Sequence, residues 1–352
     1  MVVQEKTSSA NQAIKNLIEL IGFLVYSLTL MVVAVYKRCL PSIYQKKKRI
    51  SGDVALVTGG GGGLGRLLAL RLAKLGATVV LWDVNIKGVD ETVGLVKGIG
   101  GKAYGYRCDL ADKEDVYRVA KKTQQEVGDV TILINNAGVV SGLPLLSTPD
   151  NLIKRTFDVN IIAHFWTAKA FLPKMIENDR GHIITIASLA GHLGVNKLVD
   201  YCASKYAAVG FDESLKAELD SQGVRGVKTT VVCPYFIQQT GMFDNVSSKF
   251  LPKLKANDVA DRTIEALLYE EDVVILPGYL KALLMLKPIM PWSVKSMFSK
   301  KFIPDASPHH QPTPIVQIKE SEDSFPQKIL NNSVSASVTQ TKPNLDKQGK
   351  DL

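Results

Sequence analysis

The chain has 352 residues, of which 46% are hydrophobic, and a formal net charge of +9. This length suffices for one large α/β domain with extensions, and such a domain buries a substantial core. The four cysteines are widely spaced and form no CxxC pair, which argues against zinc and thiol redox motifs. His182 and His192 lack nearby acidic or cysteine partners, so no metal is expected.

The N-terminal part contains an apolar run over residues 17–36 in which Glu19 is the single charged residue. As an α-helix this run would be about 30 Å long, which matches the hydrocarbon thickness of a bilayer. The following residues 37–49 are rich in lysine and arginine and contain no acid, which predicts that the downstream domain faces the cytosol. We expect a polar, loosely ordered segment over 1–16, a membrane anchor over 17–36 and a basic juxtamembrane segment over 37–49.

Two alternatives stay open for this N-terminal part. A hairpin that enters one leaflet, or an anchor on a lipid droplet, fits the same apolar run. The basic residues that follow are also a feature of nucleic-acid-binding proteins. Next to an apolar helix, attraction to anionic lipid head groups accounts for them better, so we expect a membrane and no nucleic acid as partner.

A glycine-rich turn follows the first predicted strand, Val54–Val57, and runs directly into a helical pattern over residues 66–75. Its spacing is Thr-Gly-x-x-x-Gly-x-Gly. In a strand–turn–helix context, such glycines let the backbone approach a pyrophosphate, and the helix N-terminus favours its negative charge. The predicted dinucleotide-binding residues of this turn are Gly59, Gly63, Leu64 and Gly65.

Two acidic residues stand at the ends of the next two predicted strands. Asp83 ends the strand over 78–83, where a carboxylate accepts hydrogen bonds from ribose hydroxyls and repels a 2′-phosphate. This position favours NAD over NADP, although the nearby Arg66 and Lys87 would weaken the preference. Asp109 ends the strand over 102–109, near the expected place of an adenine ring.

The order of elements predicts the fold class. An amphipathic helix over 112–127 is followed by a strand over 131–138 that runs into Asn135-Asn-Ala-Gly. A long helical pattern over 149–177 then precedes a buried strand over 182–188. Strands that alternate with helices at these lengths predict a parallel, doubly wound α/β sheet.

The candidate catalytic residues lie in the second half of this α/β region. Tyr201 and Lys205 are four residues apart, so they lie on one face of a helix. An ammonium group beside a phenol favours the phenolate, so we expect the pKa of Tyr201 to fall below its usual value of about 10. Tyr201 would then serve as an acid and base near neutral pH. Ser188 ends the preceding strand, where its hydroxyl can hold a substrate oxygen.

Taken together, these motifs resemble the short-chain dehydrogenase/reductase superfamily over residues 50 to about 280. The motifs that carry the resemblance are the glycine turn, Asp109, Asn135-Asn-Ala-Gly138, Asn160, Ser188 and Tyr201-x-x-x-Lys205. Several further stretches are similar to membrane-anchored epidermal retinol dehydrogenases and to related 17-beta-hydroxysteroid dehydrogenases of lipid droplets. The resemblance implies a single Rossmann-type catalytic domain over 50–280, behind an N-terminal membrane helix.

The resemblance also implies a role for each catalytic residue. Tyr201 exchanges a proton with the substrate oxygen, which Ser188 binds. Lys205 lowers the pKa of the phenol and binds the nicotinamide ribose together with Tyr201. Asn160 holds a water that links Lys205 to solvent.

Two further positions, and an assembly, follow from the same resemblance. Asn135 is implied as a cofactor contact, and Thr240 corresponds to a stretch that contacts the carboxamide. Gln238-Gln239 makes this loop one residue longer than the family pattern, which leaves the role of Thr240 open. Members of this family often pair as homodimers through the helices that carry Asn160 and Tyr201.

The C-terminal part divides into two segments. Residues 281–303 are apolar with interspersed lysines, which suits either the membrane interface or a wall at the substrate entrance. Residues 304–352 are rich in Ser, Pro, Gln, Asn and Lys, which predicts disorder.

The leading hypothesis is a membrane-anchored, NAD-preferring oxidoreductase that interconverts an apolar alcohol and its carbonyl compound. Retinol and retinal are the first substrate pair, and a 17-beta-hydroxysteroid or another lipid alcohol is the alternative. A hypothesis of another class is a lipid-surface scaffold that has lost turnover. The expected location is the endoplasmic reticulum membrane with a cytosolic catalytic domain, or the surface of a lipid droplet.

Overall fold

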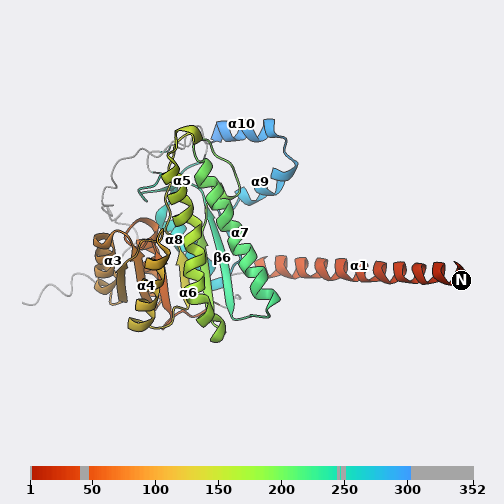
Figure 1. Cartoon of the computed structure of the whole chain (residues 1–352), viewed down its shortest axis with the longest axis horizontal. Coiled ribbons are helices and arrows are strands. Elements are labelled where there is room, and N and C mark those ends of the chain that lie inside the picture. The colour runs from red at the N-terminus through yellow and green to blue at the C-terminus, as the bar shows by residue number, and fades with distance from the viewer. Residues whose placement is uncertain (1, 40–46, 244–245, 247–250, 303–352) are drawn as a thin grey trace, which may run out of the picture. The chain divides into compact units, whose positions relative to one another are not determined.

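A seven-stranded parallel sheet forms the centre of the computed structural model, which describes residues 2–39, 47–243, 246 and 251–302 (Figure 1). Its strand order is β3-β2-β1-β4-β5-β6-β9, and every neighbouring pair is parallel. The strands are β1 (Val54–Thr58), β2 (Thr78–Asp83), β3 (Lys102–Arg107), β4 (Ile132–Asn135), β5 (Gly181–Ile186), β6 (Val227–Pro234) and β9 (Val273–Leu276). The order confirms the predicted Rossmann-type, doubly wound sheet.

The sheet is covered by helices on both faces (Figure 1). The helices of the α/β domain are α2 (Gly63–Lys74), α3 (Ile86–Gly98), α4 (Lys113–Glu126), α5 (Asp150–Phe157), α6 (Ala163–Glu177), α7 (Val199–Ser221) and α8 (Ala256–Tyr269). The strand order changes direction between β1 and β4, which leaves a crevice at the carboxyl ends of these strands. Crevices of this kind are where ligands bind in open α/β sheets.

Side chains of the central strands alternate between two hydrophobic cores. Val57 and Ile134 pack in one core with residues of α2, α3 and α8. Leu56 and Leu133, one position away in the same strands, pack in the other core with residues of α4 and α6. All four side chains are fully buried, so the period of two along each strand fixes which side of the sheet each residue faces.

The N-terminal helix α1 (Val2–Cys39) is longer than the predicted anchor. Residues 2–16, for which the sequence predicts a loosely ordered segment, belong to this helix. These residues contain no glycine or proline, so no residue in them interrupts a helix. Within α1, residues Gln12–Val33 are long and apolar enough to cross a membrane, and none of that stretch is buried in the protein.

The predicted single helix over 149–177 is interrupted. A π-helical turn (Asp158–Ile162) separates α5 from α6 and contains Asn160. Such turns insert one residue into a helix and are frequent at functional sites.

The C-terminal segment packs on the α/β domain through α9 (Leu280–Leu286) and a short 3-10 turn (Lys287–Ile289), and α10 (Trp292–Phe302) follows. Leu280, Leu283 and Leu284 join a hydrophobic cluster that contains Tyr201. The side chains of Ile289 and Trp292 are both 78% exposed. The segment therefore has one apolar face toward the domain and another that is exposed. The first face suits a wall at the substrate entrance, and the second suits the membrane interface.

Some sequence-based predictions fall outside the described part of the chain. These are the disordered tail over 304–352 and residues 40–46 of the basic juxtamembrane segment.

Candidate active site

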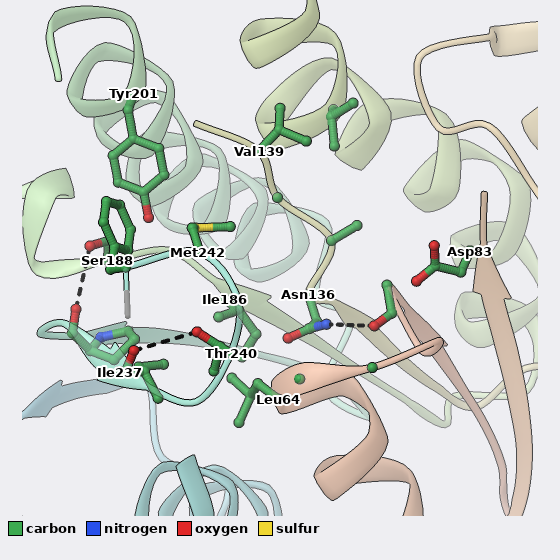
Figure 2. Close-up of a pocket in the computed structure, with 18 of the residues that line it drawn as sticks. Leu64, Asp83, Asn136, Val139, Ile186, Ser188, Tyr201, Ile237, Thr240 and Met242 are labelled. Carbon is green, nitrogen blue, oxygen red and sulfur yellow. Dashed lines mark hydrogen bonds between the residues drawn. The ribbon is translucent and has the colours of Figure 1, made fainter. Parts of the chain in front are cut away.

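A cavity of about 610 Å³ lies at the carboxyl ends of the central strands, where the strand order changes direction. The predicted residues that line it are Gly59, Gly63, Leu64, Asp83, Asp109, Ser188, Tyr201, Lys205 and Thr240. Gly65, Asn135 and Asn160 do not line it. Figure 2 shows residues from the first and second halves of the domain facing one another across this space.

The glycine turn between β1 and α2 forms one wall of the cavity. Gly59 and Gly63 have φ angles of +66° and +50°, which favour glycine. A Cβ on Gly65 would lie 2.1 Å from the carbonyl oxygen of Gly59, so Gly65 allows the helix to pack against the turn. A Cβ on Gly62, by contrast, would meet no atom within 4 Å. Because Gly62 lines the cavity, the missing side chain leaves room for a ligand.

The N-terminus of α2 adds an electrostatic preference to this wall. Its first turn contains no acidic residue, and the free backbone N–H groups there favour an anion. The open surface at Gly62 and the helix N-terminus together fit the pyrophosphate of a dinucleotide.

Asp83 lies at the end of β2, as predicted, and its carboxylate is held by two backbone groups. Gly61 N–H donates to Oδ2 and Asn85 N–H donates to Oδ1, each at 3.0 Å. Asp109 follows β3, and its Oδ1 accepts from the N–H of Ala111 at 3.1 Å. Both carboxylates line the cavity at its end near α3.

Asn135 and Asn136 point to opposite sides. Asn135 is buried in the sheet, where its Oδ1 accepts from the hydroxyl of Thr167 at 2.9 Å. Asn136 instead lines the cavity, and its Nδ2 donates to the carbonyl oxygen of Thr58 at 2.9 Å (Figure 2). The implied cofactor contact at Asn135 is therefore better matched by the position of Asn136. The alternation of side chains along β4 was the sequence signal for this assignment.

Ser188, Tyr201 and Lys205 are brought together at the other end of the cavity. Ser188 Oγ donates to the carbonyl oxygen of Pro234 at 3.3 Å and accepts from the N–H of Ala190 at 3.1 Å. Lys205 Nζ lies 5.7 Å from the centre of the Tyr201 ring and donates to the carbonyl oxygen of Ile186 at 2.8 Å. Figure 2 shows the Tyr201 hydroxyl directed into the cavity on the side of Ser188.

Burial dominates the electrostatics of this group. It raises the pKa of Tyr201 above its ordinary value, while the hydrogen bond with Ser188 lowers that pKa by a smaller amount. The expected fall in the pKa of Tyr201 is therefore wrong for this structure. The same burial lowers the pKa of Lys205 to about 8. Removing both groups from water disfavours their charged forms, and this effect outweighs their proximity.

Asn160, in the π-helical turn, connects two parts of the site. Its Oδ1 accepts from Val139 N–H at 2.8 Å, and its Nδ2 donates to Val139 O at 2.9 Å and to Ser204 Oγ at 3.0 Å. The side chain thus holds the segment after β4 against α7. It is fully buried, so its own placement is fixed by these bonds.

Thr240 lies beside the glycine turn despite the longer loop. Its carbonyl oxygen would be 3.3 Å from a Cβ on Gly63, and its hydroxyl donates to the carbonyl oxygen of Ile237 at 3.4 Å. Positive φ angles at Gln239 and Gly241, of 60° and 80°, turn the chain on either side of it. Thr240 and Gly63 therefore lie next to each other at the cavity, which both residues line.

An apolar compartment surrounds Tyr201. Phe243 contacts the Tyr201 ring edge-on at 5.6 Å between centroids, and Phe236 contacts Phe243 at 5.0 Å. Leu189, Leu198 and Leu280 belong to the same buried cluster. This end of the cavity therefore suits an apolar molecule with one oxygen near Tyr201 and Ser188.

The family model for short chain dehydrogenase matches residues 53–250 of the chain. The chain belongs to the short-chain dehydrogenase family. As such it is an oxidoreductase, and its Tyr201, Lys205 and Ser188 lie in one cavity with the glycine turn.

Relatives of this dehydrogenase agree with the assignment. It is 48% identical over 249 residues to epidermal retinol dehydrogenase 2 of Homo sapiens, covering 70% of this chain and 80% of the relative. It is 48% identical over 261 residues to short-chain dehydrogenase/reductase family 16C member 6 of Bos taurus, covering 73% and 81%. Estradiol 17-beta-dehydrogenase 11 of Homo sapiens is 44% identical over 259 residues, covering 74% and 86%.

Solved structures share the fold of this dehydrogenase. One is a short-chain dehydrogenase/reductase from Burkholderia phymatum in complex with NAD, with a TM-score of 0.63 and 26% identity, covering 76% of this chain and all of that one. Another is a metagenomic short-chain oxidoreductase in complex with NADP, with a TM-score of 0.56 and 29% identity, covering 65% and 97%.

Proposed function

We propose that this dehydrogenase is a membrane-anchored enzyme that transfers a hydride between a nicotinamide cofactor, preferentially NAD, and an apolar alcohol or carbonyl compound. Retinol and retinal are the leading substrate pair. The observation that carries the proposal is the position of Tyr201, Lys205 and Ser188 between the glycine turn and the apolar compartment. The 48% identity to an epidermal retinol dehydrogenase supports the choice of substrate.

The residues of the cavity fit a nicotinamide dinucleotide. The glycine turn and the N-terminus of α2 would hold the pyrophosphate, and Asp83 the ribose hydroxyls of the adenosine half. Asn136, Lys205 and Thr240 would contact the nicotinamide half. When bound, the nicotinamide ring supplies the hydride acceptor for oxidation and, in its reduced form, the hydride donor for reduction.

Proton transfer at the substrate oxygen is assigned to the protein. Ser188 donates a hydrogen bond to this oxygen and fixes it next to the Tyr201 hydroxyl. Because burial keeps Tyr201 in its neutral form, the phenol is ready to donate its proton to a carbonyl oxygen. In the oxidation direction, the phenolate accepts the alcohol proton, and the charge of Lys205 stabilises that phenolate.

The preference for NAD rests on Asp83. Its carboxylate would accept hydrogen bonds from the ribose hydroxyls and repel a 2′-phosphate. Replacing Asp83 with Ala should reduce the preference for NAD, measured as kcat/KM with NAD divided by kcat/KM with NADP. An unchanged ratio would show that selection lies elsewhere in the site.

The membrane part of the proposal rests on α1. None of its Gln12–Val33 stretch is buried in the protein, as expected for a helix surrounded by lipid. We propose anchoring in the endoplasmic reticulum membrane with the catalytic domain in the cytosol; the surface of a lipid droplet is the alternative location. An anchor of this kind suits substrates that partition into bilayers.

We also propose a homodimer through α6 and α7. Phe165 on α6 is 45% exposed and contacts Phe211 of α7 edge-on at 4.9 Å between centroids. This gives the two helices a shared aromatic surface suited to a second copy. Analytical ultracentrifugation of the detergent-solubilised protein would measure its oligomeric state.

A 17-beta-hydroxysteroid is the second candidate substrate, supported by 44% identity to estradiol 17-beta-dehydrogenase 11. The test compares retinol and a 17-beta-hydroxysteroid, each with NAD and with NADP, using the detergent-solubilised full-length protein. Oxidation of retinol with NAD is the expected result. Oxidation of the steroid alone would favour the second candidate. No turnover of either substrate with bound cofactor would leave another lipid alcohol or the scaffold hypothesis.

A further inference from the structure

The side chain of Arg66, in the first turn of α2, is held at the Asp83 end of the cavity by several protein groups. Its Nε donates to Thr92 Oγ1 at 3.0 Å. Its Nη2 donates to the carbonyl oxygen of Gly61 at 3.0 Å and to Glu91 Oε2 at 2.7 Å. The Arg66 side chain is 10% exposed and that of Glu91 is 46% exposed, so the ion pair lies at the edge of the cavity.

Arg66 and Asp83 are bound to the same residue from opposite sides. The N–H of Gly61 donates to Asp83 Oδ2, while the carbonyl oxygen of Gly61 accepts from Arg66. Gly61, Arg66, Asp83 and Glu91 all line the cavity. The group that would meet a ribose 2′-substituent therefore includes one guanidinium and two carboxylates.

These contacts limit the capacity of Arg66 to bind a phosphate group of a ligand. A guanidinium is the side chain best suited to bind a phosphate, because its fork makes two parallel hydrogen bonds. Here Nη2 is already bound to Glu91, and the carboxylate balances the positive charge of Arg66. A 2′-phosphate would have to approach both Asp83 and Glu91, and the repulsion between these negative charges opposes its binding.

We infer that Glu91 is a second residue that selects the cofactor. Its carboxylate pairs with Arg66 Nη2 and balances the charge of the guanidinium, and so weakens the attraction of Arg66 for a 2′-phosphate. Asp83 repels the phosphate directly, whereas Glu91 acts through Arg66, so the two residues contribute separate effects. This inference rests on the proposed function, in which the cavity binds a nicotinamide dinucleotide with NAD preferred.

The experiment measures the Kd of NAD and of NADP by isothermal titration calorimetry, with the full-length protein in detergent. The variants are Glu91→Ala, the double variant Glu91→Ala with Arg66→Met, and Glu177→Ala as control. Glu177 is an exposed acid of α6 that pairs with Lys174 at 2.8 Å and does not line the cavity. Melting temperatures of all proteins are measured in parallel.

In Glu91→Ala, NADP binding should tighten by about tenfold, the size of one charge-assisted hydrogen bond, while NAD binding stays within about twofold. Adding Arg66→Met should abolish this gain, and Glu177→Ala should leave both affinities unchanged. Because Arg66 is buried, the double variant is paired with Glu91→Ala/Arg66→Lys, which keeps the charge but lacks the fork and should retain part of the gain.

Two results would overturn the inference while leaving the proposed function intact. One is an unchanged ratio of the two affinities in a folded Glu91→Ala protein. The other is a gain that persists without Arg66. A wild-type protein that binds neither nucleotide would refute the proposed function and this inference together.

Discussion

The ammonium group of Lys287 lies 2.6 Å from the hydroxyl oxygen of Tyr206, the residue that directly follows Lys205 on α7. Lys287 also donates to the carbonyl oxygen of His192 at 2.5 Å, in the segment after Ser188. These two hydrogen bonds join the C-terminal segment to helix α7 and to the segment after Ser188, the two regions that supply the catalytic side chains.

Replacing Lys287 with Met should therefore weaken substrate binding more than turnover. Loss of the two bonds lets α9 move away from the apolar compartment, which reduces binding in the ground state and transition state alike. We expect KM for the apolar substrate to rise about three- to tenfold, with kcat within about twofold. The measurement is steady-state kinetics at saturating NAD.

The matched control is Lys281→Met, which removes a lysine from the same C-terminal segment. An equal rise in KM in both variants would show that the loss of a positive charge, and not the loss of the Lys287 hydrogen bonds, weakens substrate binding. A fall in kcat without a change in KM would contradict the proposed wall of the substrate compartment.

Replacing Gly62 with Ala should weaken nucleotide binding without destabilising the fold. Gly62 has an extended φ of −177°, which any residue adopts, and its new Cβ would project into the cavity. We expect the Kd for NAD to rise at least about tenfold with an unchanged melting temperature. Gly94→Ala is the control, because a Cβ at this position of α3 also meets nothing within 4 Å and Gly94 does not line the cavity.

Replacing Asp212 with Asn should change how stability depends on pH. Burial raises the pKa of this α7 carboxyl from its ordinary value of 3.8 to about 7. The folded state thus binds the proton more tightly, so this contribution to stability is present at low pH and is lost as pH rises from about 4 to 7. The neutral amide should remove this loss and raise the free energy of unfolding at pH 8 by about 2 to 4 kcal/mol.

Urea denaturation of the variant at pH 5 and pH 8 measures this effect. Asp220→Asn, an exposed position on the same helix, serves as control. A variant that is no more stable than the wild type at pH 8 would show that Asp212 is well solvated or paired there.

Introducing two arginines into α1, by Val25→Arg and Leu28→Arg, should release the protein from membranes. Each arginine near the centre of an apolar helix costs about 2.5 to 3.5 kcal/mol of insertion free energy. Alkaline extraction of expressed membranes should then recover the variant in the soluble fraction. The control, Val25→Ile with Leu28→Ile, should stay with the membrane, and retention of the arginine variant would contradict an α1 anchor.

Local patterns were sufficient to predict most of the fold and the site. The glycine turn, Asp83 and the Tyr201–Lys205 pair each depend on a few neighbouring residues, and their places in the structure agree with the sequence. Asn136 was missed because the motif names two adjacent asparagines, and strand alternation decides between them. The pair of Arg66 and Glu91 was not predicted, since it joins two helices that come together through the packing of the sheet.

The direction of the pKa shift of Tyr201 could not be predicted from the four-residue spacing between Tyr201 and Lys205. Lys205 is one helical turn away, but the burial that dominates comes from residues distant in sequence, such as Phe243 and Leu280. Desolvation depends on everything that surrounds a group, and spacing along one helix reports a single neighbour.

The most direct test of the central claim is the oxidation of retinol with NAD by the detergent-solubilised full-length protein and its Tyr201→Phe variant. We expect turnover by the wild type and a loss on the order of 10²- to 10⁴-fold in the variant, with the Kd for NAD unchanged. Tyr104→Phe, at an exposed position of β3, should retain full activity. A Tyr201→Phe protein that oxidises retinol at the wild-type rate would contradict the assignment of Tyr201 as the catalytic acid and base.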